Sequence, residues 1–124
     1  MAHRFAWEAD FEFDYLEEAD ILEVFFRKDT ATNAVEIADD VTLRFDEEKR
    51  VGISLILNNY SYLVEPDQYG QRSFRLKVDH LSLSTQEVIL EIIGRSPVNR
   101  FIRMLSFSDS SSHQPIPIAA IEPA

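Results

Sequence analysis

Cysteine is absent from this chain of 124 residues. Its absence excludes disulfide bonds, thiol catalysis, iron–sulfur clusters and every zinc site that uses cysteine ligands. Glycine is also scarce, because only Gly52, Gly70 and Gly94 occur and each stands apart from the others. Isolated glycines cannot form the glycine-rich loops that hold phosphates and dinucleotides. We therefore expect no bound cofactor.

A long hydrophobic run is missing as well. No stretch approaches the roughly 18 consecutive apolar residues that a membrane-spanning helix needs. Residues 1–10 lack the apolar core of a secretory signal, and they already contain carboxylates at Glu8 and Asp10. The sequence predicts a cytoplasmic protein that does not associate with membranes.

Apolar and aromatic residues, by contrast, are well represented. Hydrophobic residues make up 45% of the chain, which includes nine Phe, four Tyr and one Trp. A chain of this size and composition buries a hydrophobic core without disulfides or a metal, unlike a disordered chain. The sequence has no internal repeat, linker or low-complexity boundary, so residues 1–124 are predicted to form a single domain.

The net charge of −10 is unevenly distributed. Residues 1–50 contain 15 Asp and Glu against 6 Lys and Arg, whereas residues 51–124 contain 7 against 6. An acidic field of this kind repels nucleic acids and anionic membranes and favours encounter with basic partners. It also has a simpler explanation, because net charge keeps a β-rich protein soluble. We expect no nucleic-acid partner, and both explanations of the acidity stay open.

Apolar and polar side chains alternate through most of the first half. Residues 5–15 place aromatic residues at odd positions and mostly acidic residues at even positions, the period of a strand with one buried and one wet face. This segment forms either one strand or two, with a bend at residues 9–10. Polar turns then separate four further alternating strands, at residues 22–26, 35–37, 41–45 and 51–57. Strands on such short connections predict an antiparallel meander.

A helix is predicted over residues 84–94. Ser84 would be its N-cap, Glu87 the partner of Ser84 in a capping box, and Leu83 with Val88 the hydrophobic staple. Gly94 would end the helix. The helix carries an apolar stripe that must pack on the sheet, formed by Val88, Ile89, Ile92 and Ile93.

The remaining C-terminal residues are extended in character. Residues 101–107 alternate again and predict a further strand, and residues 115–118, with two prolines, predict an edge strand or a docked tail. The predicted fold class is α+β, an antiparallel β-meander of about five to seven strands with one amphipathic helix packed on it.

Two runs of the chain carry a family resemblance. The first is Glu17-Glu18-Ala19-Asp20 with the alternating strand that follows, and the second is residues 35–58, with an acidic turn and Val51-Gly52-Ile53. In their order they resemble the prokaryotic domain-of-unknown-function family 2283, over about residues 13–60 of this chain. Two positions depart from the family pattern, since Leu16 stands where relatives often carry Asp and the Asp39-Asp40 turn lacks glycine.

The resemblance implies a small β-rich domain with no established activity and no catalytic residue. Residues 81–124, with the helix, the strand and the tail, lie outside it. Some relatives look like the partner half of toxin and antitoxin gene pairs. That likeness implies an antitoxin-like role, in which an acidic protein meets a basic one.

Carboxylates in the predicted turns are the candidate metal ligands. They would come together only if two turns lay at the same end of the sheet, and turns are also acidic simply because they are solvent-exposed. Residues 46–50 lack the ligand spacing and the central glycine of a calcium loop. A metal-dependent enzyme or small-ligand binder is the alternative function, with these candidate ligands: Glu17, Glu18, Asp20, Asp46 and Glu48.

No arrangement of catalytic residues is present. His3, His80 and His113 are scattered without the spacing of metal ligands, and no serine lies in a nucleophile motif. We therefore predict no catalytic residue.

The one basic stretch follows the predicted helix. Arg95, Arg100 and Arg103 either complement the carboxyl end of the helix or meet the acidic half of a second copy of the chain. The leading prediction is a noncatalytic protein-interaction module that binds a basic protein or forms a homodimer. Aromatic residues and Arg are enriched at interfaces, and the candidates are Phe25, Tyr60, Tyr62, Arg100, Phe101 and Arg103.

Overall fold

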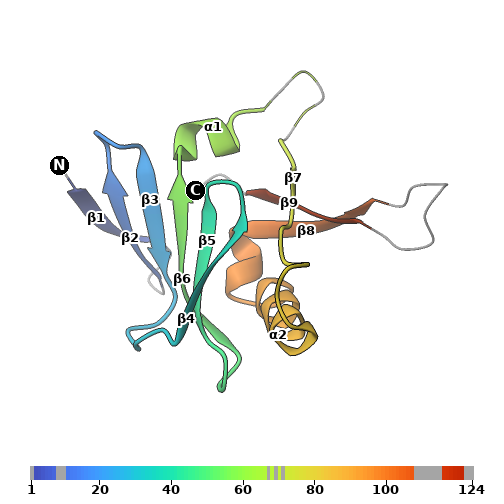
Figure 1. Cartoon of the computed structure of the whole chain (residues 1–124). Coiled ribbons are helices and arrows are strands. Elements are labelled where there is room, and N and C mark those ends of the chain that lie inside the picture. The colour runs from blue at the N-terminus through green and yellow to red at the C-terminus, as the bar shows by residue number, and fades with distance from the viewer. Residues whose placement is uncertain are drawn as a thin grey trace.

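The computed structural model describes residues 2–7, 11–66, 68, 70, 72–107 and 116–121. Within them the chain forms two antiparallel sheets, one long helix, one short helix and a 3-10 turn. The predicted α+β class, with an antiparallel sheet and one amphipathic helix packed on it, is confirmed (Figure 1). None of the described helices is long and apolar enough to cross a membrane.

The larger sheet has six strands, and each neighbouring pair is antiparallel. In their order across the sheet they are β1 Ala2–Trp7, β2 Phe11–Leu16, β3 Ile21–Phe25, β6 Val51–Asn58, β5 Val41–Asp46 and β4 Asn33–Ala38. The alternating segment over residues 5–15 therefore spans two paired strands. The residues between these strands, 8–10, lie outside the described part of the chain.

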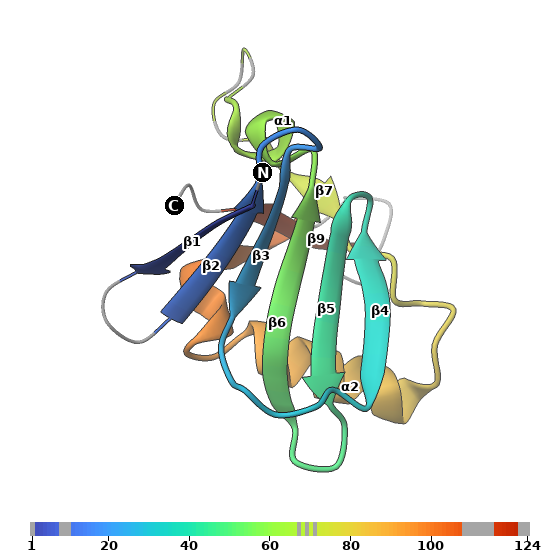
Figure 2. The ribbon, with the colours of Figure 1, turned by 90° about the vertical axis from the view of Figure 1, so that its left-hand side faces the viewer.

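The strand order is that of two three-stranded meanders placed side by side. β3 pairs with β6, while β4 lies at the far edge of the sheet. Residues 26–32 carry the chain along one end of the sheet from β3 to β4 (Figure 2). Alternation along a strand does not predict this order, because the side-chain pattern is the same whichever strand lies next to it.

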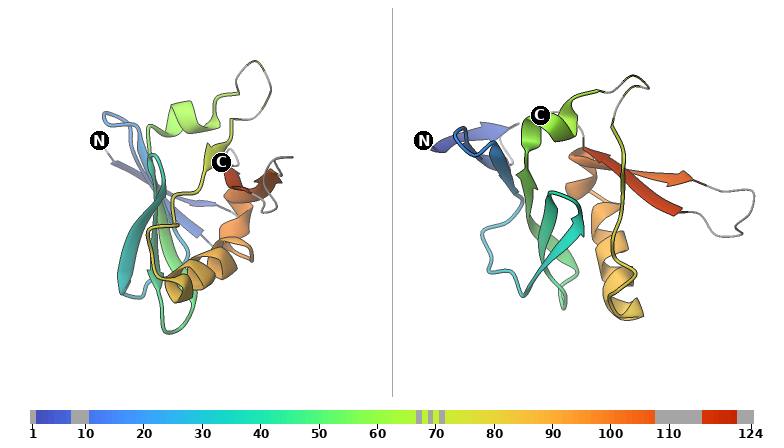
Figure 3. Two further views of the ribbon diagram at one scale, coloured as in Figure 1. Left: turned by 45° about the vertical axis from the view of Figure 1, so that its right-hand side comes forward. Right: turned by 45° about the horizontal axis from the view of Figure 1, so that its top comes forward.

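One face of the six-stranded sheet is covered and forms the core. Helix α2, Leu83–Ile93, lies across this face, and the 3-10 turn η1, Val98–Arg100, follows it (Figure 1, Figure 3). Figure 2 looks onto the opposite face, and no described helix or strand lies in front of it. The predicted apolar stripe of α2 is confirmed, because its four residues are buried: Val88, Ile89, Ile92 and Ile93.

A second, smaller sheet stands beside the helix. Its strands are β7 Phe74–Arg75, β8 Ile102–Phe107 and β9 Ile116–Ile121, with β9 in the middle. The strand predicted over residues 101–107 is confirmed, but β9 is central rather than an edge strand or a tail. Pro117 is tolerated there because the described part of β7 pairs only with Ile118 and Ala119, which leaves no partner opposite Pro117 on that side.

The N-cap of α2 differs from the prediction by two residues. Ser82, not Ser84, is the N-cap, and its hydroxyl accepts the backbone N–H of Thr85 at 3.3 Å. Leu83 is 78% exposed and forms no staple. Both serines suit the N-cap position. Leu81, which packs against the core, anchors the chain directly before Ser82 and decides between them.

Gly52 of β6 lies where the helical layer comes closest to the sheet. A Cβ at this position would lie 2.8 Å from Cγ2 of Val98 and 3.2 Å from Cγ2 of Ile92. Both of these side chains are buried. Glycine therefore allows η1 and α2 to pack directly against β6.

A β-bulge in β6 meets the connection between β3 and β4. β5 pairs its Arg44 with Ser54 and its Phe45 with Gly52, which leaves Ile53 as an extra residue. The carbonyl of Ile53 instead accepts the first backbone N–H of the connection, at 2.8 Å. The bulge thereby fastens the connection that leads to the far edge.

Gly52→Ala is expected to lower the free energy of unfolding by about 1–3 kcal/mol, because the added Cβ must displace packed side chains. Urea unfolding followed by circular dichroism measures the loss. In a Val98→Ala background the same change should cost less, since the closest neighbour has been shortened. Equal costs in both backgrounds would contradict the close contact.

Ser82→Ala should cost about 1 kcal/mol of stability, because it removes the cap of α2. Ser84→Ala is the matched control and should be close to neutral, since Ser84 lies in the first turn of the helix. Thermal denaturation of the two variants makes the comparison. A larger loss for Ser84→Ala would place the helix start at residue 84 after all.

Candidate functional site

Two acidic turns and a short helix lie at one end of the large sheet. Ile21 pairs with Asn58, and Val41 with Leu57, so the β2–β3 turn, the β4–β5 turn and the chain leaving β6 meet there. Helix α1, Tyr60–Val64, follows β6 almost directly (Figure 2). We call this region the acidic end, and its carboxylates are Glu17, Glu18, Asp20, Asp39, Asp40 and Glu65.

The predicted metal ligands do not come together. Asp46 ends β5 and Glu48 lies in the β5–β6 turn, at the opposite end of the sheet from Glu17, Glu18 and Asp20. Asp46 is buried, and its carboxylate accepts a backbone N–H of its own turn at 2.9 Å. Within the described ranges, no group of three or more His, Asp and Glu is arranged to hold a metal ion.

Asp20 is the structural centre of the acidic end. The hydroxyl of Tyr15 donates to its Oδ1 at 2.6 Å, and Ser61 donates its backbone N–H to Oδ2 at 3.0 Å and its hydroxyl to Oδ1 at 2.9 Å. The carbonyl of Asp20 accepts the backbone N–H of Tyr60 at 3.0 Å. Asp20 has a φ of 54°, a left-handed conformation that Asp adopts more readily than most residues. These bonds fasten α1 to the β2–β3 turn.

The same hydrogen bonds shift two pKa values. The bond from Tyr15 lowers the pKa of Asp20 below its ordinary 3.8, and the bonds from Ser61 act in the same direction. The carboxylate in turn raises the pKa of Tyr15 above 10.0. At neutral pH Asp20 is ionised, and both of its carboxylate oxygens already accept hydrogen bonds from Tyr15 and Ser61.

Two large apolar side chains are exposed in the acidic end. Leu16, the last residue of β2, is 39% exposed, and Tyr62 of α1 is 50% exposed. The guanidinium of Arg72 stacks over the Tyr62 ring, 4.0 Å from its centroid, and Nε of Arg72 donates to the Tyr62 carbonyl at 3.2 Å. Tyr62 is thereby held in position while its ring stays accessible.

Phe101, a predicted interface residue, is instead part of the core. It is only 4% exposed. The centroid of its ring lies 5.5 Å from that of Phe11, 5.6 Å from Phe13 and 5.7 Å from Phe26. The prediction was wrong because the turn after α2 places this ring against β2 and the start of the β3–β4 connection, which neighbouring residues in the sequence do not reveal.

The other predicted interface residues lie at or near the surface. Arg103 and Arg100 are exposed, and the guanidinium of Arg100 lies 5.5 Å from the centroid of an aromatic ring of β2. Tyr60 is partly buried and packs edge-on against Tyr15, with 6.1 Å between ring centroids. Phe25 is partly buried on the uncovered face of the sheet. The candidates therefore do not form one surface.

Arg95, from the predicted basic stretch, joins the end of α2 to the β5–β6 turn. It pairs with Glu91 at 3.1 Å and donates to the carbonyl of Arg50. Arg50 pairs with Glu91 at 2.9 Å, and this bond lowers the pKa of Glu91. Of the two explanations offered by the sequence, stabilisation of the helix end fits Arg95.

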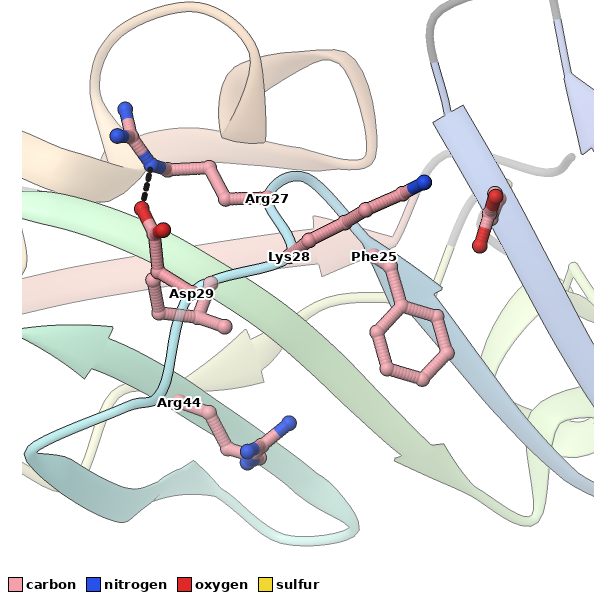
Figure 4. A pocket seen from close by; sticks show the side chains of 7 residues that line it. Phe25, Arg27, Lys28, Asp29 and Arg44 are labelled. Carbon is pink, nitrogen blue, oxygen red and sulfur yellow. Dashed lines mark hydrogen bonds and ion pairs between the residues drawn. The ribbon is translucent and has the colours of Figure 1, made fainter.

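A pocket on the uncovered face was not predicted from the sequence. It has a volume of about 360 Å³ and lies beside the connection between β3 and β4 (Figure 4). The strand register places four of the residues here in one row across the sheet: Glu12, Phe25, Ser54 and Arg44. We call it the Phe25 pocket.

A polar network on the same face of the sheet joins two residues of this row to Glu23 of β3. Ser54 is fully buried, and its hydroxyl donates to Oε2 of Glu23 at 2.7 Å. One guanidinium nitrogen of Arg44 donates to Ser54 at 3.1 Å and to Glu23 at 3.2 Å. The network holds the Arg44 side chain over the sheet. A lone serine inside the apolar strand over residues 51–57 was the one sequence signal of it.

No family model, no curated protein and no solved structure matches the chain. The resemblance of residues 13–60 to the domain-of-unknown-function family 2283 therefore stays a prediction.

Asp20→Asn is expected to cost about 1 kcal/mol at neutral pH, because the carboxamide cannot accept all the bonds that the carboxylate accepts. The folded-state pKa of Asp20 lies below the unfolded value, so its contribution is present above 3.8 and is lost as the pH falls through the folded pKa. The stability difference between wild type and variant should therefore shrink on acidification.

Urea unfolding at neutral pH and at about pH 3 measures this difference. Tyr15→Phe serves as the control, since it removes the strongest donor to Asp20 and should raise the pKa of that carboxyl in an NMR titration. A wild type and an Asp20→Asn variant that lose stability in parallel on acidification would contradict the role of Asp20.

Proposed function

We propose that this chain is a noncatalytic protein-interaction module that binds a basic protein partner through its acidic end. The observation that carries the proposal is the combination of exposed carboxylates with exposed Leu16 and Tyr62 in the same region. Apolar anchors inside a charged surround are typical of protein-binding surfaces.

The charge of the acidic end supports a basic partner. Glu17, Glu18, Asp39 and Glu65 are exposed there. Among the cations nearby, Lys77 is paired with Asp39, and Arg72 is engaged with Tyr62. Carboxylates outnumber cations in the acidic end, so its field is negative, and such a field accelerates the encounter with a positively charged surface.

Rigidity also supports a binding role. Asp20 joins the β2–β3 turn to α1 through bonds to Tyr60, Ser61 and Tyr15. The turn and the helix therefore keep their relative positions before a partner arrives. A preorganised surface loses less conformational entropy on binding than a flexible one.

Charge reversal in the acidic end tests the proposal. The double variant Glu17→Lys/Glu18→Lys should lose the partner that the wild-type protein captures from cells that produce it. Capture by the wild type should itself weaken as the salt concentration rises from about 50 to about 300 mM, because ions screen the contact. Mass spectrometry of the captured material identifies the partner and gives its net charge.

Matched controls separate this site from general charge and stickiness. Glu48→Lys/Glu87→Lys changes the net charge equally but leaves the acidic end intact, and it should retain the partner. Tyr62→Ala should weaken binding about tenfold, as for an interface anchor, whereas Leu83→Ala, which removes an exposed apolar side chain on α2, should not. Equal capture by all variants, or capture only of a second copy of the chain, would overturn the proposal.

A further inference from the structure

The Phe25 pocket lies apart from the acidic end. Some of the charged side chains that line it are paired with other residues, and others are not. Arg27 and Asp29 pair with each other at 2.9 Å. Arg44 pairs with Glu23 at 3.2 Å and donates to Ser54. The side chains of Lys28 and Glu12, in contrast, make no hydrogen bond or ion pair with any described residue. The pocket therefore presents one unpaired cation and one unpaired carboxylate.

These two charges flank an apolar floor. Glu12 is the cross-strand neighbour of Phe25, which places it directly beside the ring on the β2 side. Figure 4 shows Lys28 extending past the Phe25 ring on one side and Arg44 approaching it from the other. Ile53, which the β-bulge adds to β6, completes the apolar lining.

The positive charges are the exception on this face. The outer face of the described strands β2 to β6 carries carboxylates at Glu12, Glu23 and Glu36. Arg44 is already paired with Glu23 at 3.2 Å, so Lys28 provides the local site for an anionic group, within a protein whose net charge of −10 repels anions elsewhere. A purely anionic ligand would be repelled by the Glu12 carboxylate. A ligand that also carries a cationic group would pair with both Lys28 and Glu12.

We propose that the Phe25 pocket binds a free α-amino acid with an apolar side chain. Its carboxylate lies by Lys28, its ammonium group by Glu12, and its side chain on Phe25 and Ile53. A volume of about 360 Å³ is at the small end of the range for ligand pockets and suits a molecule of this size. This site is independent of the partner surface at the acidic end.

L-phenylalanine is the probe, and amide NMR shifts of the full chain report binding. N-acetyl-L-phenylalanine lacks the ammonium charge, and L-phenylalaninamide lacks the carboxylate. Each should bind about three- to fivefold more weakly than the free amino acid, the usual effect of losing one partly exposed charge pair. The shifts should centre on the amides around Phe25.

Two substitutions should each erase one of these preferences. The Glu12→Gln variant should bind L-phenylalanine no more tightly than N-acetyl-L-phenylalanine, but still more tightly than L-phenylalaninamide. The Lys28→Gln variant should bind L-phenylalanine no more tightly than L-phenylalaninamide, but still more tightly than N-acetyl-L-phenylalanine. Glu87→Gln and Lys49→Gln, which remove the same charge types outside the pocket lining, should keep both preferences. A melting curve for each variant confirms that the fold is intact.

Either of two results would overturn the proposal. One is the absence of shifts around Phe25 at about 10 mM phenylalanine, ten times the concentration that half-fills a site of 1 mM affinity. The other is equal binding of the three compounds, which would show that the aromatic ring alone is recognised. Neither result bears on the acidic end, because no variant used here touches it.

Discussion

The packing of the helical layer on one face of the large sheet is the contact on which the rest of this structure depends. The apolar face of the sheet has to be covered, and α2 and η1 pack against it at Gly52, where an added Cβ would lie 2.8 Å from Val98. Phe101, which follows η1, then packs against the aromatic residues of β2 and against Phe26 of the connection after β3. Each of these positions is determined by the others.

Covering one face leaves the other face and the ends of the sheet for binding. The bulge at Ile53 lies directly beside Gly52, so the same stretch of β6 accommodates the helical layer on one side and lines the Phe25 pocket on the other. The connection held by the bulge supplies Lys28 to that pocket. Packing of the core and shape of the outer surface are thus linked through a few residues of one strand.

Acidic residues of this chain serve two different purposes. Asp20 and Asp46 are engaged by backbone and side-chain donors and stabilise turns at opposite ends of the sheet. Glu17 and Glu18 occupy the same turn as Asp20 but stay exposed. The acidic run of this turn therefore has two roles. Asp20 stabilises the structure, whereas Glu17 and Glu18 lie on the surface, because successive residues of a turn point in different directions.

The sequence by itself determined the local structure: the alternation predicted the strands, and the apolar stripe from Val88 to Ile93 predicted the helix and its buried face. These features depend on near neighbours along the chain, so their period can be read directly. Only the tertiary structure decided that β3 lies beside β6, that Ser82 caps α2, that Phe101 is buried, and that Glu12, Phe25 and Arg44 form one row. Each of these depends on contacts between residues distant in sequence, and such contacts leave no period in the chain.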